Sequence, residues 1–387
     1  MRNPLSDTIV TIKPSGIRKF FDIVSEMEDA ISLGVGEPDF DTPWHIRDEG
    51  IYSLEKGRTF YTSNAGLKQL REEIAHYLRR RYQVSYDPLH EIMITVGGSE
   101  AIDIALRAMV NSGDEVLIPQ PSYVSYEPCA VLAGAKPVII PLKAENEFRL
   151  TAQELLDAIT EKTKILILPY PNNPTGAIME REDLEAIAKI VEEKDLFVIS
   201  DEIYSELTYK GNPVSITQIP GMRERTVLIN GFSKAYAMTG WRLGYLACNT
   251  TMYQVVLKLF QHSISCTSGF LQRGALTAMD CVEETEQMRQ AYEKRKNLLV
   301  KGIHEIPGVE LLTPAGAFYA WVKFDTDMDS ETLCNDLLDK AKIAGVPGIA
   351  YGEEDCVCIR FSFAASEDVL RTMLERLKTY QTTHNDL

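Results

Sequence analysis

Short runs of apolar residues alternate with segments of helical periodicity through the middle of the chain. The runs are apolar throughout rather than at every second position, as is typical of strands buried on both faces of a sheet. They lie at 91–96, 115–119, 136–142, 163–169, 196–200, 225–229 and 243–248. Helices are expected at 46–56, 67–82, 99–110, 122–133, 151–160 and 180–194. The alternation predicts an α/β fold with a mostly parallel sheet of about seven strands, covered by helices.

The two ends of the chain follow a different pattern. The first 45 residues are broken by proline and glycine, with one short helix expected around 18–28. Beyond residue 282 the pattern predicts a long polar helix and a smaller α+β layer. Its expected elements are helices near 283–305, 330–344 and 366–380 and strands at 309–312, 318–323 and 357–363. We therefore predict a large domain over 46–282 and a small domain formed by 1–45 and 283–387.

Charge and cysteine usage narrow the possible partners. The 387 residues include 40 basic and 56 acidic side chains, a net charge of −16, which disfavours nucleic acid and anionic membranes as partners. The seven cysteines are irregularly spaced, so neither a disulfide framework nor a metal site is expected. The N-terminus lacks the apolar core of a signal peptide, and no window is apolar enough to cross a bilayer. A cytoplasmic protein is the expectation.

One stretch carries the main chemical signal. The apolar run 225–229 ends at a turn, Ser233 and Lys234 follow, and Arg242 lies eight positions beyond the lysine. The amine can form a Schiff base with an aldehyde, while the hydroxyl and the guanidinium can hold a phosphate. Taken alone, the same residues could equally be a solvated loop lysine and a surface ion-pair partner.

The ends of the other predicted strands carry polar or aromatic side chains as well. Gly98 and Ser99 follow one run and open a helix, which is a favourable seat for a phosphate. Tyr123, Asn173 and Asp201 each follow a further run. Ligands of open α/β sheets bind at the carboxyl ends of the strands, so we expect these side chains to meet. A helix cap, a plain turn and a helix-start acid are the alternatives for Ser99, Asn173 and Asp201.

Pyridoxal phosphate accounts for all of these residues together. Lys234 would bind its aldehyde, and Asp201 would pair with the protonated pyridine nitrogen and make the ring a stronger electron sink. Tyr204 and Asn173 would hydrogen-bond the phenolic oxygen, and Tyr123 would stack on the ring. The residues expected at the phosphate are Gly98, Ser99, Ser233 and Arg242.

The chain resembles the fold-type-I pyridoxal-phosphate enzymes of the class I/II aminotransferase family, in the bacterial branch of aspartate and aromatic aminotransferases. The motifs that carry the resemblance are Gly36-Glu-Pro-Asp-Phe40, Tyr61 before Gly66-Leu67, Gly97-Gly-Ser-Glu100, Asn173-Pro-Thr-Gly176, Asp201-Glu-Ile-Tyr204, Ser233-Lys234 with Arg242, and Ile359-Arg-Phe-Ser362. The resemblance implies a homodimer in which Tyr61 reaches the phosphate of the partner's cofactor. It also implies that Arg360 and the backbone near Gly36 bind the α-carboxylate of the substrate.

Arg360 can also be argued from its own surroundings. Val357, Ile359, Phe361 and Phe363 fall on one face of a predicted strand, which leaves Arg360 on the other. A guanidinium among apolar residues needs an anion, and a carboxylate held by two hydrogen bonds fits it. An ion pair within the protein is the alternative.

The expected function is amino transfer from an aromatic amino acid, aspartate or a related L-amino acid to a 2-oxo acid, with 2-oxoglutarate implied by the resemblance. Lys234 would act as general base at Cα, with Asp201 and Tyr204 supporting the ring. A carbon–sulfur β-lyase of the same fold, acting on substrates such as cystathionine, is the main alternative, and an acyl-CoA-using synthase is a weaker one. A cofactor-sensing module of a transcription regulator is disfavoured, because the residues before the first main helix are few and not basic.

Overall fold

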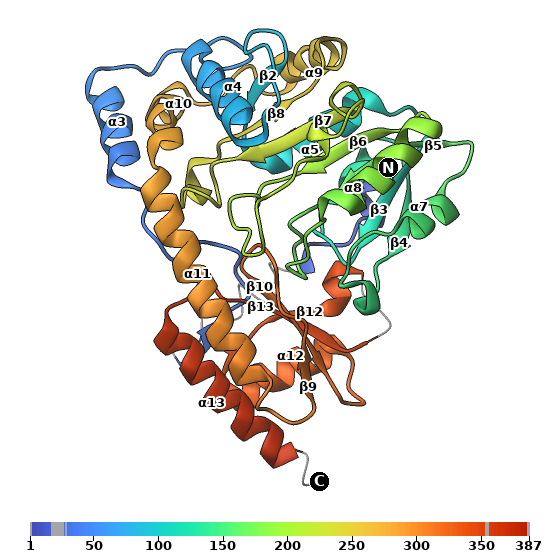
Figure 1. Ribbon diagram of the computed structural model, residues 1–387, viewed down its shortest axis with the longest axis vertical. Helices are drawn as coiled ribbons and strands as arrows, with labels where there is room; N and C mark the ends of the chain where they lie inside the picture. Colours follow the sequence, from blue (N-terminus) through green and yellow to red (C-terminus); the bar gives the residue numbers. More distant parts are fainter. Residues whose placement is uncertain (1, 17–26, 28, 353–355, 385–387) are drawn as a thin grey trace.

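A seven-stranded sheet forms the centre of the computed structural model, which describes residues 2–16, 27, 29–352 and 356–384 (Figure 1). In spatial order its strands are β2 (Ile92–Thr95), β8 (Gly244–Ala247), β7 (Thr226–Gly231), β6 (Phe197–Asp201), β5 (Thr163–Leu168), β3 (Glu115–Gln120) and β4 (Lys136–Pro141). The strands from β7 to β4 pair in parallel, and β8 runs antiparallel to both of its neighbours. The predicted α/β fold is confirmed, and each apolar run became one strand.

Helices cover both faces of this sheet. On one side lie α5 (Gly97–Met109), α6 (Tyr126–Leu132) and α9 (Thr250–Ser263), and on the other lie α4 (Lys68–Tyr82) and α8 (Arg181–Glu193). Successive residues of a strand point to opposite faces. Within β5, Ile165 and Ile167 therefore pack under α5, whereas Leu166 and Leu168 pack under α8. Burial on both faces explains why the runs of the inner strands are apolar at most consecutive positions.

The C-terminal part of the chain forms a second, antiparallel layer. Its sheet has the order β12 (Val346–Pro347), β13 (Cys358–Ser362), β10 (Tyr319–Phe324) and β9 (Val309–Leu311). The helices α11 (Val282–Ile303), α12 (Ser330–Asp336) and α13 (Glu367–His384) belong to the same part, and α11 runs from the large sheet to the small one (Figure 1).

The N-terminal segment joins this second layer. The short strands β1 (Ile31–Ser32) and β11 (Ile343–Ala344) pair in parallel, so residues more than three hundred positions apart lie side by side. The other α-helices of the described residues are α1 (Asp7–Thr11), α3 (Trp44–Glu55), α7 (Ala152–Ala158) and α10 (Gly269–Gly274). The domain boundaries at 45/46 and 282/283 stay a prediction.

Some details differ from the sequence prediction or fall outside it. The prediction of a helix near 330–344 is wrong at its C-terminal end. There α12 passes into a π-helical turn at Leu337–Ala341, and Lys342 takes a left-handed conformation before β11 begins. The requirement to pair with β1 outweighs the helical pattern there. The helices α9 and α10 were not predicted, although Asn249 caps α9 through the Met252 amide at 3.0 Å. The helix expected around 18–28 lies almost wholly outside the described residues.

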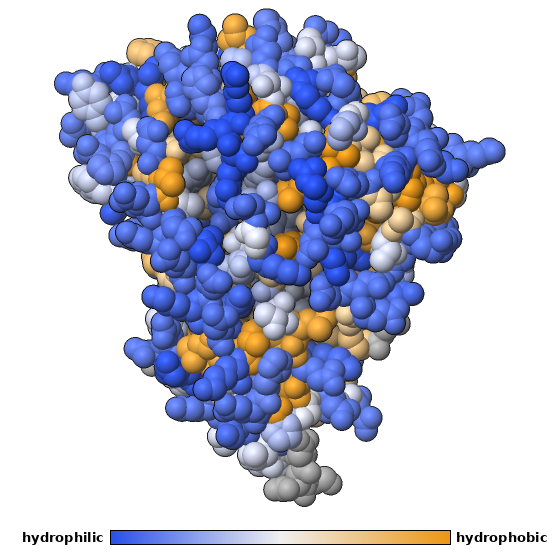
Figure 2. All heavy atoms as spheres, viewed as in Figure 1, coloured by the Kyte–Doolittle hydropathy of each residue, from blue (hydrophilic) through white to orange (hydrophobic). Residues whose placement is uncertain are grey.

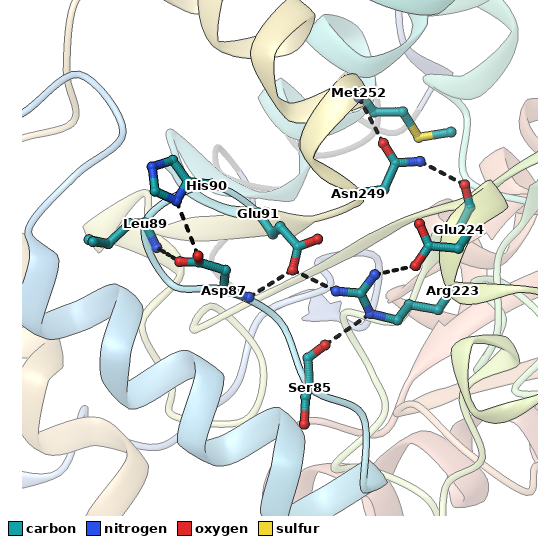
Figure 3. Close-up of polar contacts among 9 residues, drawn as sticks. All are labelled: Ser85, Asp87, Leu89, His90, Glu91, Arg223, Glu224, Asn249 and Met252. Carbon is teal, nitrogen blue, oxygen red and sulfur yellow. Dashed lines mark hydrogen bonds and ion pairs between the residues drawn. The ribbon is translucent and has the colours of Figure 1, made fainter.

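A polar network anchors the edge strand β2 (Figure 3). The Arg223 guanidinium, just before β7, donates to Glu91 at 2.5 Å, to the Ser85 carbonyl at 2.9 Å and to Glu224. Glu91 directly precedes β2 and also accepts the Asp87 amide at 2.7 Å. One arginine thus ties the connection that leads into β2 to the start of the central strand β7.

The surface is mostly polar. On the face drawn in Figure 2, hydrophilic side chains predominate and apolar residues form small separate patches. Among the described residues, no helix is long and apolar enough to span a membrane.

Candidate active site

A cavity of about 590 Å³ opens where the parallel strands end and the C-terminal layer meets them. Residues from the loops after β5, β6 and β7 line it together with residues of β10, β13 and the N-terminal segment. The lining includes eleven of the twelve residues predicted from the sequence: Gly36, Gly98, Ser99, Tyr123, Asn173, Asp201, Tyr204, Ser233, Lys234, Arg242 and Arg360. Tyr61 does not line it, and its side chain is 91% exposed.

Lys234 lies beyond β7 with its amine facing the cavity. The amine donates to the Gly36 carbonyl and stands 5.7 Å from the Tyr204 ring centre. Burial, followed by the charges of Arg360 and Arg242, lowers the pKa of Lys234 to about 8, although Glu37 opposes the shift. At pH 7 about one amine in ten is then neutral, against about one in 2,500 for an ordinary lysine. The cavity therefore prepares this side chain as a nucleophile and base.

Asp201 is the last residue of β6, and Ile229 lies beside it on β7, so Asp201 and Lys234 come from neighbouring strands. The carboxylate is buried. Its Oδ2 accepts the Tyr126 hydroxyl at 2.7 Å, and its Oδ1 accepts the Ile203 amide at 3.2 Å. Burial raises the pKa of Asp201, and both hydrogen bonds and Lys234 act against this rise. The helix-start alternative does not hold, because a turn rather than a helix follows.

The opposite end of the cavity can hold a phosphate. The helix α5 begins at Gly97, and Gly98 and Ser99 of its first turn line the cavity. Gly97 has φ +76°, and a Cβ built there would lie 2.7 Å from the Arg242 guanidinium. Only glycine allows the arginine and the helix start to approach so closely. A helix N-terminus beside a guanidinium is a strong seat for an anion.

Arg360 lies on β13 and is 1% exposed, and the guanidinium stands 4.3 Å from the Tyr319 ring centre. One nitrogen donates to Asn173 Oδ1 at 2.9 Å and another to the Gly34 carbonyl, while the buried Nε has no partner. No carboxylate of the described residues pairs with it, which contradicts the ion-pair alternative there. A buried cation with an unpartnered donor is suited to an incoming carboxylate.

Other polar residues that line the cavity were not predicted as site residues from the sequence. Tyr126 donates to Asp201, and the Tyr319 and Tyr204 hydroxyls are hydrogen-bonded at 2.7 Å. Glu37 accepts the Thr239 hydroxyl at the rim. Tyr126 could have been found, since it follows Tyr123 by one helical turn, whereas nothing in the sequence near Tyr319 indicates its contact.

Comparison with known proteins gives a consistent result. The family model described as "Aminotransferase class I and II" matches residues 28–377. The aspartate aminotransferase of Pyrococcus abyssi is 42% identical over 97% of each chain, and the aromatic-amino-acid aminotransferase 2 of Thermococcus litoralis is 41% identical with the same coverage. A solved structure of the Thermus thermophilus aspartate aminotransferase with maleate superposes with a TM-score of 0.93, at 35% identity, covering 98% of this chain and 100% of that one.

Proposed function

Because this chain belongs to the aminotransferase class I and II family, we propose that it moves the amino group of an aromatic L-amino acid, aspartate or a related compound to a 2-oxo acid, with 2-oxoglutarate as acceptor. The family depends on pyridoxal phosphate, and the residues present fit that group. The observation that carries the proposal is one cavity faced by the Lys234 amine, the buried Asp201 carboxylate and two arginines. The aspartate and aromatic relatives support these substrate classes.

When bound, pyridoxal phosphate supplies an aldehyde that condenses with amines and a ring that accepts the electrons released at Cα. Lys234 would hold that aldehyde in the resting enzyme, and its amine, when free, would take the Cα proton of the substrate and return it on the cofactor side. The lowered pKa of Lys234 makes the neutral amine available near pH 7. Asp201 would pair with the protonated ring nitrogen.

The remaining residues hold the cofactor and orient the substrate. Arg360 and the backbone at Gly36 bind the α-carboxylate, so that the Cα hydrogen faces the lysine. Asn173 and Tyr204 would hydrogen-bond the phenolic oxygen, and Tyr123 would pack on the ring face. The start of α5, with Gly98 and Ser99, would hold the phosphate together with Ser233 and Arg242.

A half-reaction screen tests this function. The purified holoprotein is mixed with single amino acids, and both the cofactor absorbance and the 2-oxo acid released are measured. Aromatic amino acids or aspartate should convert the cofactor to its amino form, and 2-oxoglutarate should restore it. Lys234→Ala should abolish turnover, and full turnover in that variant would refute the role of the lysine.

The carbon–sulfur lyase alternative is not favoured, because the relatives that match over nearly the full chain are aminotransferases. Cystathionine provides the decisive substrate. Release of pyruvate and ammonia without amino transfer would overturn the proposed reaction while leaving the cofactor assignment in place.

We also propose a homodimer in which Tyr61 completes the partner's site. The side chains of Phe60 and Tyr61 are 84% and 91% exposed, which is unusual for adjacent large aromatic residues. Tyr61→Ala and Lys234→Ala subunits should each be impaired alone. Mixed subunits should regain activity, because one site in each hybrid dimer has both its own lysine and the partner's tyrosine. No recovery in hybrids whose formation has been verified would contradict this proposal.

The domain division at 46 and 283 and a cytoplasmic location are proposals too. Limited proteolysis that cuts within 46–282 before it cuts at the boundaries would argue against the division. Cell fractionation would test the location.

A further inference from the structure

We infer that Tyr126 is a positioning residue for the Asp201 carboxylate, and that its hydroxyl keeps this carboxylate ionised opposite the ring nitrogen. The inference rests on the proposed function, since it assigns Tyr126 a role in that reaction. The hydroxyl lies 2.7 Å from Asp201 Oδ2, and both side chains are buried.

The carboxylate needs such a donor because of where it lies. Asp201 ends an apolar strand, and removal from water favours its neutral form. A neutral carboxyl group could not stabilise a positive charge on a pyridine ring. In the described surroundings, hydrogen bonds from the Tyr126 hydroxyl and the Ile203 amide and the more distant charge of Lys234 favour the ionised form. The tyrosine bond is the shorter of the two hydrogen bonds.

Tyr126 itself remains a donor throughout. Burial and the neighbouring Asp201 charge raise the pKa of Tyr126 well above its usual value, so the hydroxyl keeps its proton near neutral pH. A phenol that keeps its proton can donate it to the ionised Asp201. The carboxylate has capacity for about four hydrogen bonds in all, so acceptor sites remain for a ring N–H.

The same turn of the chain also presents the residue expected to stack on the ring. Tyr126 is the first residue of α6, and its amide donates to the Tyr123 carbonyl at 3.2 Å. The two rings meet edge to face, with centres 5.6 Å apart at 84°. A single four-residue turn therefore fixes both the ring-face contact and the donor to Asp201, and a displacement of one ring displaces the other.

Tyr126→Phe removes the hydroxyl and keeps the ring. The holoenzyme is loaded with cofactor labelled with ¹⁵N at the ring nitrogen, and the NMR chemical shift of that nitrogen should move toward the value of an unprotonated pyridine. The kcat should fall about tenfold, the factor that ~1.4 kcal/mol of lost transition-state stabilisation gives. The KM for the amino acid should change less than twofold, because the α-carboxylate contacts are untouched.

Tyr380→Phe is the matched control. Tyr380 is also buried and donates to an aspartate, Asp336, at 2.5 Å, but on α13, away from the cavity. It should leave both the nitrogen signal and kcat unchanged. A wild-type signal and kcat in Tyr126→Phe would overturn the inference, as would equal effects in the two variants.

Two further variants distinguish a failure of the Tyr126 role from a failure of the proposed pairing between Asp201 and the ring nitrogen. In an Asp201→Asn background no carboxylate remains to be stabilised, so adding Tyr126→Phe should cost no more activity. If Asp201→Asn alone keeps near-normal transamination, the proposed pairing with the ring nitrogen fails, not only the role of Tyr126. Should Tyr126→Phe fold poorly, 3-fluorotyrosine at position 126, a stronger donor, should move the nitrogen signal the opposite way. An unmoved signal would overturn the inference.

Discussion

Replacing Arg360 by lysine tests the α-carboxylate site most sharply, because it removes one hydrogen bond and keeps the charge. Arginine has five N–H donors and lysine has three. In the structure Arg360 gives one donor to Asn173 and one to the Gly34 carbonyl. Three donors then remain for a substrate carboxylate, enough for a bidentate contact. A lysine that satisfies the same two oxygens has one donor left.

The expected cost follows from this count. A hydrogen bond to a charged group contributes about 1.5–3 kcal/mol, so kcat/KM for an amino acid should fall about 10- to 150-fold. Because the positive charge remains, the Lys234 amine should keep its lowered pKa, whereas an uncharged replacement of Arg360 would remove the second-largest cause of that lowering. The lysine variant therefore isolates carboxylate binding from the basicity of Lys234.

The assay compares two substrates that differ only in the carboxylate. Single-turnover rates of cofactor conversion are measured with L-phenylalanine and with 2-phenylethylamine, which lacks the carboxylate. Arg360→Lys should slow the first by the predicted factor and leave the second within about twofold. Arg295→Lys is the matched control, since Arg295 also holds a carboxylate with two nitrogens, that of Asp39 at 2.7 and 2.9 Å, outside the cavity lining. An equal loss with both substrates, or no loss, would refute the carboxylate role.

Three further outcomes are expected from other parts of the molecule. Burial raises the pKa of Glu202 from 4.5 to about 8. The contribution of this group to the free energy of unfolding is therefore complete below pH 4.5 and is lost as the pH rises from 4.5 through 8. In that range the free energy of unfolding of Glu202→Gln, measured with urea, should rise relative to that of the wild type by up to about 1.4 kcal/mol per pH unit. Arg223→Ala should lower the free energy of unfolding by about 1–3 kcal/mol with normal activity per folded molecule, and an unchanged urea midpoint would contradict this. Gly97→Ala should weaken cofactor affinity as well as stability, because the new methyl group meets the guanidinium of Arg242 at a residue with φ +76°, and equal affinity in a titration of apoprotein would refute the proposed phosphate seat.

The sequence predicted which side chains meet at the proposed cofactor end because most of them lie at or soon after the end of a strand. Asp201 ends β6, Lys234 follows β7, and Gly98 and Ser99 follow β2. The carboxyl ends of these strands share one edge of the sheet, so the linear pattern already determined which side chains meet. The apolar runs were clear because burial on both faces leaves few polar positions in the inner strands, most of them near the strand ends.

The rest of the site depends on contacts that no local pattern indicates. Tyr319 reaches Tyr204 from β10, and Arg360 reaches Asn173 from β13, across 115 and 187 positions of sequence. These pairings come from how the antiparallel layer packs on the large sheet. Short segments were difficult for the same reason: β11 exists because β1 is beside it, and its own sequence continues the pattern of a helix.

The two ends of the cavity are built from different parts of the chain, and this difference should affect substrate specificity. The proposed catalytic end is built on strand ends, whose positions the buried sheet determines closely. The proposed α-carboxylate end is assembled from the N-terminal segment and the antiparallel layer, through Gly36, Tyr319 and Arg360. The close approach of Gly36 to the Tyr319 hydroxyl, where a Cβ would lie at 2.0 Å, shows that these parts are in tight contact. Substitutions along that contact should therefore change KM and substrate preference, whereas substitutions at the strand ends should change kcat.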